Sequence, residues 1–363
     1  MSKIGWWSTF LGEEEIAAAN EAMAAKSFSQ GAVTQALENE IATHLGVKGA
    51  IVTTSGSSAI LMTLLAANIG PGDEVIVPDV TWIATANAVH LLGAKVVLAE
   101  TEPNRPVLDV ERVATLITDR TKAILPVHLN GRAVNMQALQ DLAKEKELIV
   151  IEDAAQALAS KHHGRFLGTI GDMGIYSLSL TKLVSTGQGG VVVSNDQDLL
   201  DRLQSVRVHG VANYGGEERY MGMGFNFKFT DVLAGIGRAQ FARLDAKVAH
   251  VTQVYKRYQK GLEGAKGLSI IPVDIENGEV PVWTEVLCEN RAAVIDFLDS
   301  RDIGSRPYHP AIHTAPYLSD APEHANALTF ATQGLVLPSG PSQPFKAVDE
   351  TIAALKEYAE TLV

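Results

Sequence analysis

Lys182 is the one charged residue between Asp172 and Asp196. It lies in YSLSLTKLVSTGQGG (residues 176–190), a run of apolar or small neutral residues that ends in glycines. Burial in such a run disfavours the ammonium form, so the amine would lose part of its proton affinity. A neutral lysine amine can attack an aldehyde and form an imine. The alternatives for Lys182 are a solvated surface lysine and a buried lysine paired with a carboxylate.

Two other short segments offer complementary chemistry. Asp153 ends the apolar run LIVIED, and ligands of open parallel sheets bind at the carboxyl ends of the strands. An acid there can also ligate a metal or cap the next helix. Gly56 and Ser57 stand at the predicted start of a helix, where free backbone N–H groups and the helix dipole favour an anion. A Ser-Gly-Ser sequence in that place is also a common helix cap.

Taken together, the three segments meet the requirements of one cofactor. Pyridoxal 5'-phosphate needs an imine-forming lysine, a carboxylate against its ring nitrogen and a grip on its phosphate. Lys182, Asp153 and the Gly56–Ser57 turn can supply these groups. The sequence therefore predicts a pyridoxal phosphate site at one rim of a parallel sheet, with no metal.

The elements that must position these residues alternate from about residue 48 onward. Short β-branched runs are followed by segments of helical period, which is typical of a sheet covered by helices on both faces. The predicted fold class is α/β, with a mostly parallel central sheet. Strands are predicted over 49–56, 71–79, 95–100, 123–129, 148–157 and 189–196, helices over 57–68, 85–93 and 136–147, and a hairpin over 159–172 that turns at Gly164.

A second unit is predicted after a long polar helix over residues 251–264. It contains a strand over 280–289 and helices over 291–302 and 347–362. We place the large cofactor-binding domain at residues 1–245, N-terminal segment included, and a smaller C-terminal α+β domain at 246–363.

Composition narrows the partners and the compartment. The net charge of −12 is spread along the chain, which disfavours nucleic acid and anionic membrane surfaces as partners. Cys288 is the single cysteine, so no disulfide framework is expected. With no apolar signal core at the start and no long apolar run, a cytoplasmic protein is predicted.

The order of motifs resembles the DegT/DnrJ/EryC1/StrS family of pyridoxal phosphate aminotransferases, which have fold type I and make amino sugars from keto sugars. The resemblance covers almost the whole chain. The motifs that carry it are SGSSAI, IGPGDEVIVPDVTWIATANAV, PVHLNG, IEDAAQA, GDMGIYSLSLTKLVSTGQGGVVVSND, GFNFKFTD and SRPYHPAIHTAPY.

The resemblance implies a role for each matching residue. Lys182 would bind the cofactor covalently and Asp153 would bind its ring nitrogen. The other implied cofactor-binding residues are Gly56, Ser57 and Ser177 on the phosphate, Trp82 stacked on the ring, Gln156 near the phenolic oxygen, and Asn226, offered to the phosphate by the partner subunit of a homodimer. His313 and Lys228 would lie toward the substrate.

The implied reaction moves an amino group from an amino acid, L-glutamate in this family, to a keto sugar linked to a nucleotide. Such enzymes serve amino-sugar and surface-polysaccharide biosynthesis. The chain departs from the family pattern at Trp82, Asn130, Gln188 and Lys228, where the family more often has Phe or Tyr, Tyr, Glu and Arg. These departures leave the sugar, the nucleotide and the carbon that is aminated undetermined, and Gln188 without a role.

Other functions are also compatible with the sequence. The fold also hosts lyases, aldolases and cysteine desulfurases, and it could serve a non-catalytic regulator that binds the cofactor or a sugar. A desulfurase needs a mobile nucleophilic cysteine, whereas Cys288 falls in an alternating strand pattern. His309 and His313 have the spacing of a zinc pair, but Pro310 opposes the helix that such a pair requires.

Overall fold

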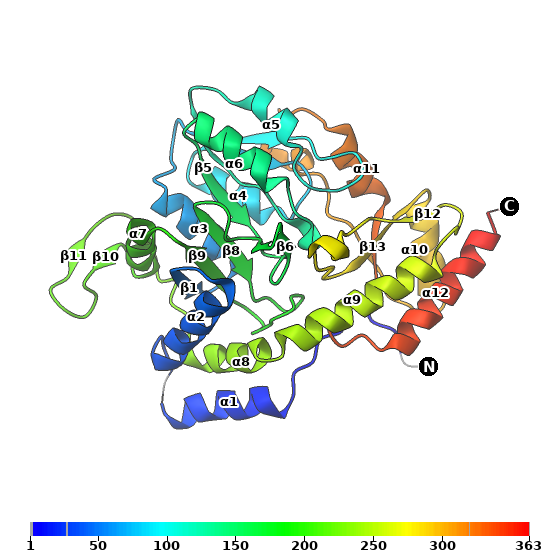
Figure 1. Cartoon of the computed structure of the whole chain (residues 1–363), viewed down its shortest axis with the longest axis horizontal. Coiled ribbons are helices and arrows are strands. Elements are labelled where there is room, and N and C mark those ends of the chain that lie inside the picture. The colour runs from blue at the N-terminus through cyan, green and yellow to red at the C-terminus, as the bar shows by residue number, and fades with distance from the viewer. Residues whose placement is uncertain (1–2, 27, 319, 363) are drawn as a thin grey trace.

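The computed structural model describes residues 3–26, 28–318 and 320–362. Two sheets organise the chain, and Figure 1 shows them in separate parts of the molecule, joined by the long helix α9 (Leu244–Gly261). The larger sheet has seven strands in the order β1-β9-β8-β5-β4-β2-β3. Its strands are β1 (Gly49–Thr53), β2 (Glu74–Pro78), β3 (Lys95–Ala99), β4 (Thr121–Ile124), β5 (Ile149–Asp153), β8 (Met173–Ser177) and β9 (Gly190–Ser194).

This larger sheet is mostly parallel, as the sequence predicts. The exception is β9, which pairs antiparallel with both β1 and β8. Alternate residues of each strand enter different cores: Val75 and Val77 pack with one set of helices and Ile76 with another. Helices α3 (Gly56–Ala66), α4 (Ala84–Leu91) and α7 (Gln197–Arg207) cover one face, and α2 (Ala32–Leu45), α5 (Val110–Leu116), α6 (Met136–Glu145) and α8 (Asp231–Phe241) cover the other.

Local sequence explains several element boundaries. Side chains cap helix starts at Ser55, Asp109, Asn135 and Asp196, each by accepting a backbone N–H of the first turn. The predicted hairpin is confirmed as β6 (Lys161–His162) and β7 (Arg165–Phe166), with its turn at His163 and Gly164.

The strand predicted over 123–129 is displaced in the structure. β4 ends at Ile124, and only an isolated bridge between Val127 and Asp153 continues the pairing. Pro126 has no N–H to offer to a ladder, which accounts for the early end of the strand.

The smaller sheet, in the order β12-β13-β15-β14, lies against α9, α10 (Arg291–Asp299) and α12 (Phe345–Glu360). Its strands are β12 (Leu268–Ile270), β13 (Thr284–Cys288), β14 (Arg306–Pro307) and β15 (Gly334–Leu337). The predicted boundary at residue 245 falls in the first turn of α9. The extended N-terminal segment crosses this boundary, because Ile4 and Trp7 form parallel bridges to Ile303 and Ser339.

The remaining elements lie at the periphery. Helix α1 (Glu13–Ala24) packs on α8, and the hairpin β10 (Val211–Ala212) and β11 (Arg219–Tyr220) projects from the body at the left of Figure 1. The other elements are α11 (Ala325–Gln333), η1 (Leu129–Gly131), η2 (Ile275–Asn277), η3 (Ile312–Thr314) and η4 (Pro316–Leu318).

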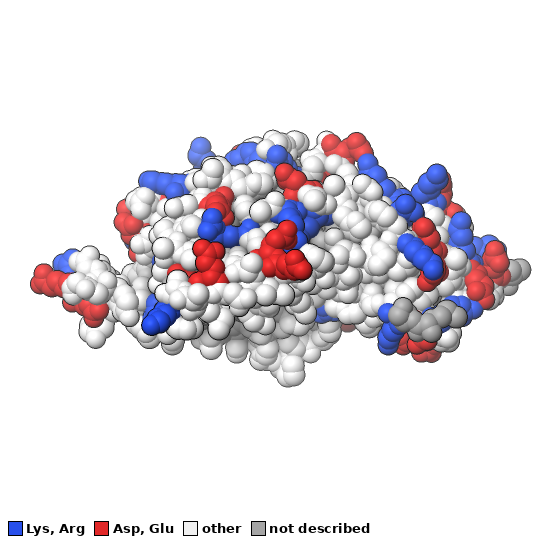
Figure 2. Space-filling model, turned by 90° about the horizontal axis from the view of Figure 1, so that it is seen from below, with Lys and Arg blue, Asp and Glu red and all other residues white. Residues whose placement is uncertain are grey.

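The charge distribution on the surface and the apolar length of the helices are relevant to the predicted partners. Figure 2 shows basic and acidic side chains intermixed over the face seen from below, without a patch of one sign. Within residues 3–26, 28–318 and 320–362, no helix is both long and apolar enough to cross a membrane.

Candidate active site

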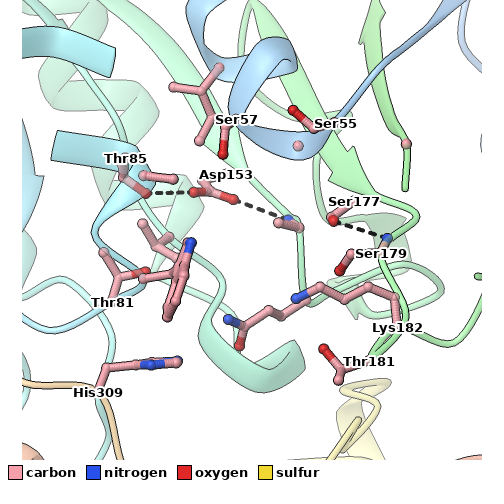
Figure 3. Close-up of a pocket in the computed structure, with 18 of the residues that line it drawn as sticks. Ser55, Ser57, Thr81, Thr85, Asp153, Ser177, Ser179, Thr181, Lys182 and His309 are labelled. Carbon is pink, nitrogen blue, oxygen red and sulfur yellow. Dashed lines mark hydrogen bonds between the residues drawn. The ribbon is translucent and has the colours of Figure 1, made fainter. Parts of the chain in front are cut away.

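A cavity of about 300 Å³ opens at the carboxyl ends of the central strands of the larger sheet. Strands β2, β5 and β8 end at this edge, and the first turn of α3 lies beside them. Figure 3 shows Lys182 and Asp153 entering the cavity from different sides. The end of β5 and the loop after β8 therefore bring a carboxylate and an amine into one space.

Lys182 lies in the loop between β8 and β9. The loop is folded back on itself, because Leu178 N donates to Gly189 O at 2.9 Å and Thr186 N donates to Leu178 O at 2.9 Å. Burial lowers the pKa of Lys182 to about 8, with Asp153 opposing the shift and Arg306 adding to it. Its Nζ lies 5.1 Å from the centre of a Trp283 ring, and no carboxylate of a described residue lies within ion-pair distance of it. The amine is therefore largely free for chemistry.

Asp153 is the last residue of β5 and is almost fully buried. One carboxylate oxygen accepts a hydrogen bond from Thr85 Oγ1 at 2.7 Å, and the other accepts from Ala155 N at 3.1 Å. Burial raises the pKa of Asp153, and the hydrogen bonds from Thr85 and Ala155 partly oppose that shift. Asp153 is the one acidic side chain among the described residues that line the cavity.

The first turn of α3 also lines the cavity and supplies backbone N–H groups to it. Ser55 Oγ accepts the Ser58 N–H at 3.0 Å, whereas the N–H groups of Gly56 and Ser57 have no partner among the described residues. A Cβ atom at Gly190 would lie 2.2 Å from Ser55 O, so only glycine lets β9 pass this close to the turn. Ser177 lies beside Gly56, where an added Cβ would meet its side chain at 3.1 Å.

The sequence profile of the DegT/DnrJ/EryC1/StrS aminotransferase family matches residues 10–356 of the chain. The chain belongs to this family. GDP-perosamine synthase of Caulobacter vibrioides is 36% identical to it over 330 residues, which are 88% of each protein. The dTDP-3-amino-3,4,6-trideoxy-alpha-D-glucose transaminase of Streptomyces venezuelae is 34% identical over 362 residues, or 96% of this chain and 94% of the relative.

Solved structures agree with this membership. S. venezuelae DesV, in complex with a ketimine intermediate, superposes with a TM-score of 0.91 at 32% identity, covering 96% of this chain and 94% of that one. The aminotransferase TlmJ from Streptoalloteichus hindustanus superposes with a TM-score of 0.95 at 27% identity over the full length of both chains. The fold class and the enzyme class expected from the sequence are thereby confirmed.

Aminotransferases of this family use pyridoxal phosphate, and the cavity fits that cofactor. An imine-forming amine, a single carboxylate and a helix start with unpaired N–H groups lie around one space. Because Gly190 has no side chain, Gly56 N stays clear for a phosphate; an added Cβ would lie 2.8 Å from it. No group of three or more potential metal-ligating side chains occurs in the part of the chain that the structure describes.

The structure brings most of the predicted site residues together. Seven of them line the cavity: Gly56, Ser57, Trp82, Asp153, Gln156, Ser177 and Lys182. Gln156 is oriented by a hydrogen bond from Asn130 N to its Oε1 at 2.9 Å. Trp82 follows β2 and lies edge-on to His309, with ring centres 5.5 Å apart.

Three predicted residues lie elsewhere in this chain. Asn226 is exposed in the segment after β11, and Lys228 lies with Nζ 5.3 Å from the centre of the Tyr214 ring. His313 does not line the cavity, because buried Asp79 captures it: the two carboxylate oxygens accept His313 N at 2.8 Å and Nδ1 at 2.6 Å. The short helix η3 presents both groups to Asp79 together.

Sequence reasoning missed several residues that line the cavity. These are Thr81, Thr85, Ser179, Thr181, Trp283, Arg306 and His309. Gln188, which had no role, also lines it. Burial and nearby positive charge lower the pKa of His309 to about 4, so its ring is neutral near pH 7. Of these residues, only Thr85 could have been suggested by local sequence, because it follows the predicted site residue Trp82 by about one helical turn at the start of α4.

Proposed function

We propose that this enzyme transfers an amino group from L-glutamate to a keto sugar linked to a nucleoside diphosphate, in amino-sugar biosynthesis. The observation that carries the proposal is that Lys182 and Asp153, the one lysine and the one acid in the described lining, share one cavity. The names of the relatives, a GDP-perosamine synthase and a dTDP-amino-sugar transaminase, support a sugar acceptor.

Each residue has a task in this reaction. The α3 turn, with Ser57 and Ser177, would hold the phosphate, and Asp153 would keep a proton on the ring nitrogen. Bound pyridoxal phosphate supplies an electron sink that stabilises the charge left when a proton leaves the carbon bearing the amine. Lys182, with a pKa of about 8, would take that proton and return it during the transfer.

The test is a pair of half-reactions followed by absorbance. L-Glutamate should convert the lysine-bound cofactor to the amine form with release of 2-oxoglutarate, and the correct keto sugar should reverse the change. GDP-, dTDP- and UDP-linked keto sugars form the acceptor panel, and Lys182→Ala is the control. Binding of the cofactor without any oxoglutarate release would favour the non-catalytic regulator instead.

We further propose a homodimer whose active sites are shared. The support is the segment from β10 to Asn226, which extends away from its own cavity and exposes large apolar side chains: Tyr214, Tyr220, Met221, Met223 and Phe225. Exposed apolar groups gathered on one projection are typical of a protein interface. Asn226 of each chain would then reach the phosphate in the partner's cavity.

Mixed dimers test the shared site. In a dimer of one Lys182→Ala chain and one Asn226→Ala chain, one cavity keeps both residues and the other loses both. Random mixing should therefore restore about a quarter of the wild-type sites, since half of the dimers are mixed. Activity no higher than the average of the two separate variants would contradict this arrangement.

A further inference from the structure

All four tryptophans of the chain gather around the active-site cavity. Trp82 and Trp283 line it, Trp7 lies edge-on to Trp283 with ring centres 6.3 Å apart, and Trp6 lies 6.2 Å from Trp7. The N-terminal pair is fixed in place, because Trp7 bridges to Ser339 and its Nε1 donates to Leu180 O at 3.1 Å. Three distant segments therefore place indole rings in the cavity lining or next to it.

Arg306 lies over two of these rings. Its guanidinium carbon is 5.0 Å from the Trp6 ring centre and 6.0 Å from the Trp82 ring centre. Pairing of β14 with β15, Arg306 opposite Val336, fixes its backbone. Stacking on indoles occupies the faces of a guanidinium but leaves its five in-plane N–H donors unpaired.

Nothing in residues 3–26, 28–318 and 320–362 accepts those donors. The Arg306 side chain has neither a hydrogen bond nor an ion pair there, although the residue is half-buried and lines the cavity. The other arginines that stack on rings differ from it: Arg257, over Phe345, also pairs with Asp349 at 3.1 Å. A half-buried arginine that lines a cavity and has no protein acceptor has donors available for an anionic ligand.

The lining offers no second cation for this purpose. Lys182 is required for the chemistry, and the His309 ring is neutral near pH 7. In a protein with a net charge of −12, an anionic ligand needs a local positive group. Arg306 is that group in the described part of the lining.

The position of Arg306 indicates which of the two anionic substrates it would bind. The α-carboxylate of an amino donor is attached to the reacting carbon and must lie deep, next to Lys182. The diphosphate of a nucleotide-linked sugar is separated from the aminated carbon by the sugar ring and lies farther out. Arg306 contacts Trp6, which lies outside the cavity lining, and Trp82, whose side chain is more than half exposed, so it borders the mouth.

We propose that Arg306, held between Trp6 and Trp82, binds the diphosphate of the acceptor and so selects a nucleotide-linked sugar over a free one. This inference rests on the proposed function. Arginine suits the task because its planar fork can donate two parallel hydrogen bonds to phosphate oxygens, which lysine cannot reproduce.

The test measures binding of GDP, dTDP and UDP to the cofactor-loaded enzyme. Intrinsic fluorescence reports on the site directly, because every tryptophan of the chain lies near it, and calorimetry gives an independent Kd. For the tightest-binding nucleotide, Arg306→Gln should raise the Kd at least tenfold, and Arg306→Lys should raise it less. Arg257→Gln, at the stacked arginine that has its own carboxylate, is the matched control and should leave the Kd unchanged.

A second readout separates the acceptor from the donor. Arg306→Gln should raise two quantities unequally: the Kd for the nucleotide, and the glutamate concentration that half-saturates the first half-reaction. The fold-change in the first should be at least ten times the fold-change in the second. A variant that binds the nucleotide as the wild type does would overturn the inference. So would one that loses the glutamate reaction and keeps nucleotide binding, because Arg306 would then bind the donor carboxylate.

Failure of the inference and failure of the proposed function give different results. If the wild type aminates a free keto sugar and binds none of the nucleotides, the inference fails and aminotransfer stands. If it binds a nucleotide through Arg306 but aminates no nucleotide-linked keto sugar, the diphosphate site stands and the proposed acceptor fails. Thermal unfolding and cofactor absorbance of each Arg306 variant show whether the fold is retained.

Discussion

The environment of Lys182 sets when its amine can react. Desolvation lowers its pKa to about 8, whereas the charge of Asp153 and the ring of Trp283 favour the ammonium form. The result is an amine that is partly neutral near pH 7, which a solvated lysine is not. Asp153 is kept in place by Thr85 and the Ala155 N–H, so both reactive groups depend on their neighbours.

Covalent capture of the cofactor should follow the titration of Lys182. Because only the neutral amine attacks the aldehyde, the capture rate of cofactor-free protein should rise about tenfold per pH unit below pH 8 and level off above it. Absorbance of the lysine-bound cofactor after rapid mixing measures the rate. A rise that continues to pH 10.5 would mean that the amine is solvated like a free lysine.

Thr85→Val should weaken catalysis through Asp153. Without the hydroxyl, the carboxylate loses a hydrogen bond and its pKa rises further, so kcat should fall roughly tenfold. The acid limb of the pH profile should move to higher pH, since more base is needed to ionise Asp153. Thr85→Ser keeps the donor and should keep both kcat and the profile; an unshifted acid limb in Thr85→Val would rule out this role.

At the scale of elements, the site depends on how closely β9 passes the start of α3. β9 is the antiparallel strand between β1 and β8, and it brings Gly190 against the turn that ends at Ser55. The loop that carries Lys182 returns into this strand. The first turn of α3, which we propose to bind the phosphate, and the loop that carries Lys182 are therefore positioned by the same contact.

Gly190→Ala should disrupt that contact. The new Cβ would lie 2.2 Å from Ser55 O, so backbone must shift, and we expect a loss of about 1–3 kcal/mol in the free energy of unfolding together with weaker cofactor binding. Gly70→Ala is the control, because nothing lies within 4 Å of its added Cβ. Urea unfolding and equilibrium dialysis of the cofactor measure the two effects. Equal behaviour of the two variants would refute this account.

Across the whole molecule, a buried ion pair joins the two predicted domains next to the cavity. Arg132, fully buried after η1, donates to Glu285 of β13 at 2.5 Å and to the carbonyl groups of Ile271 and Pro272. Asn130, two residues before Arg132, bonds to the backbone of Trp283, two residues before Glu285. Its Nδ2 donates to Trp283 O and its Oδ1 accepts from Trp283 N. These contacts hold Trp283 beside the Lys182 amine.

Replacing one partner of the Arg132–Glu285 pair should destabilise the protein more, per substitution, than replacing both. Arg132→Met or Glu285→Leu alone leaves a buried charge without its partner, and each should lower the free energy of unfolding by roughly 3–5 kcal/mol. The double variant should lose clearly less than the sum of the two, as measured by urea unfolding. Strict additivity would mean that the two residues stabilise the protein independently.

Local sequence patterns predicted the fold class and the cofactor, which are confirmed, and they pointed to residues that share one cavity in the structure. Lys182 and Asp153 could be identified because each carries its own signal, an isolated charge in an apolar run and an acid at the end of a strand. The start of α3 could be identified because capping is a property of neighbouring residues. Alternation of strand and helix periods then placed all three at one edge of a sheet.

Tertiary structure decided which other side chains share the cavity. Arg306 and Trp6 are 300 residues apart in the sequence and meet because the N-terminal segment bridges to Ile303 and Ser339. His313 was predicted toward the substrate, but buried Asp79 captures it and His309 lines the cavity in its place. Periodicity reports which face of an element is apolar, but long-range pairing and competition between buried acceptors decide which polar side chains a cavity receives.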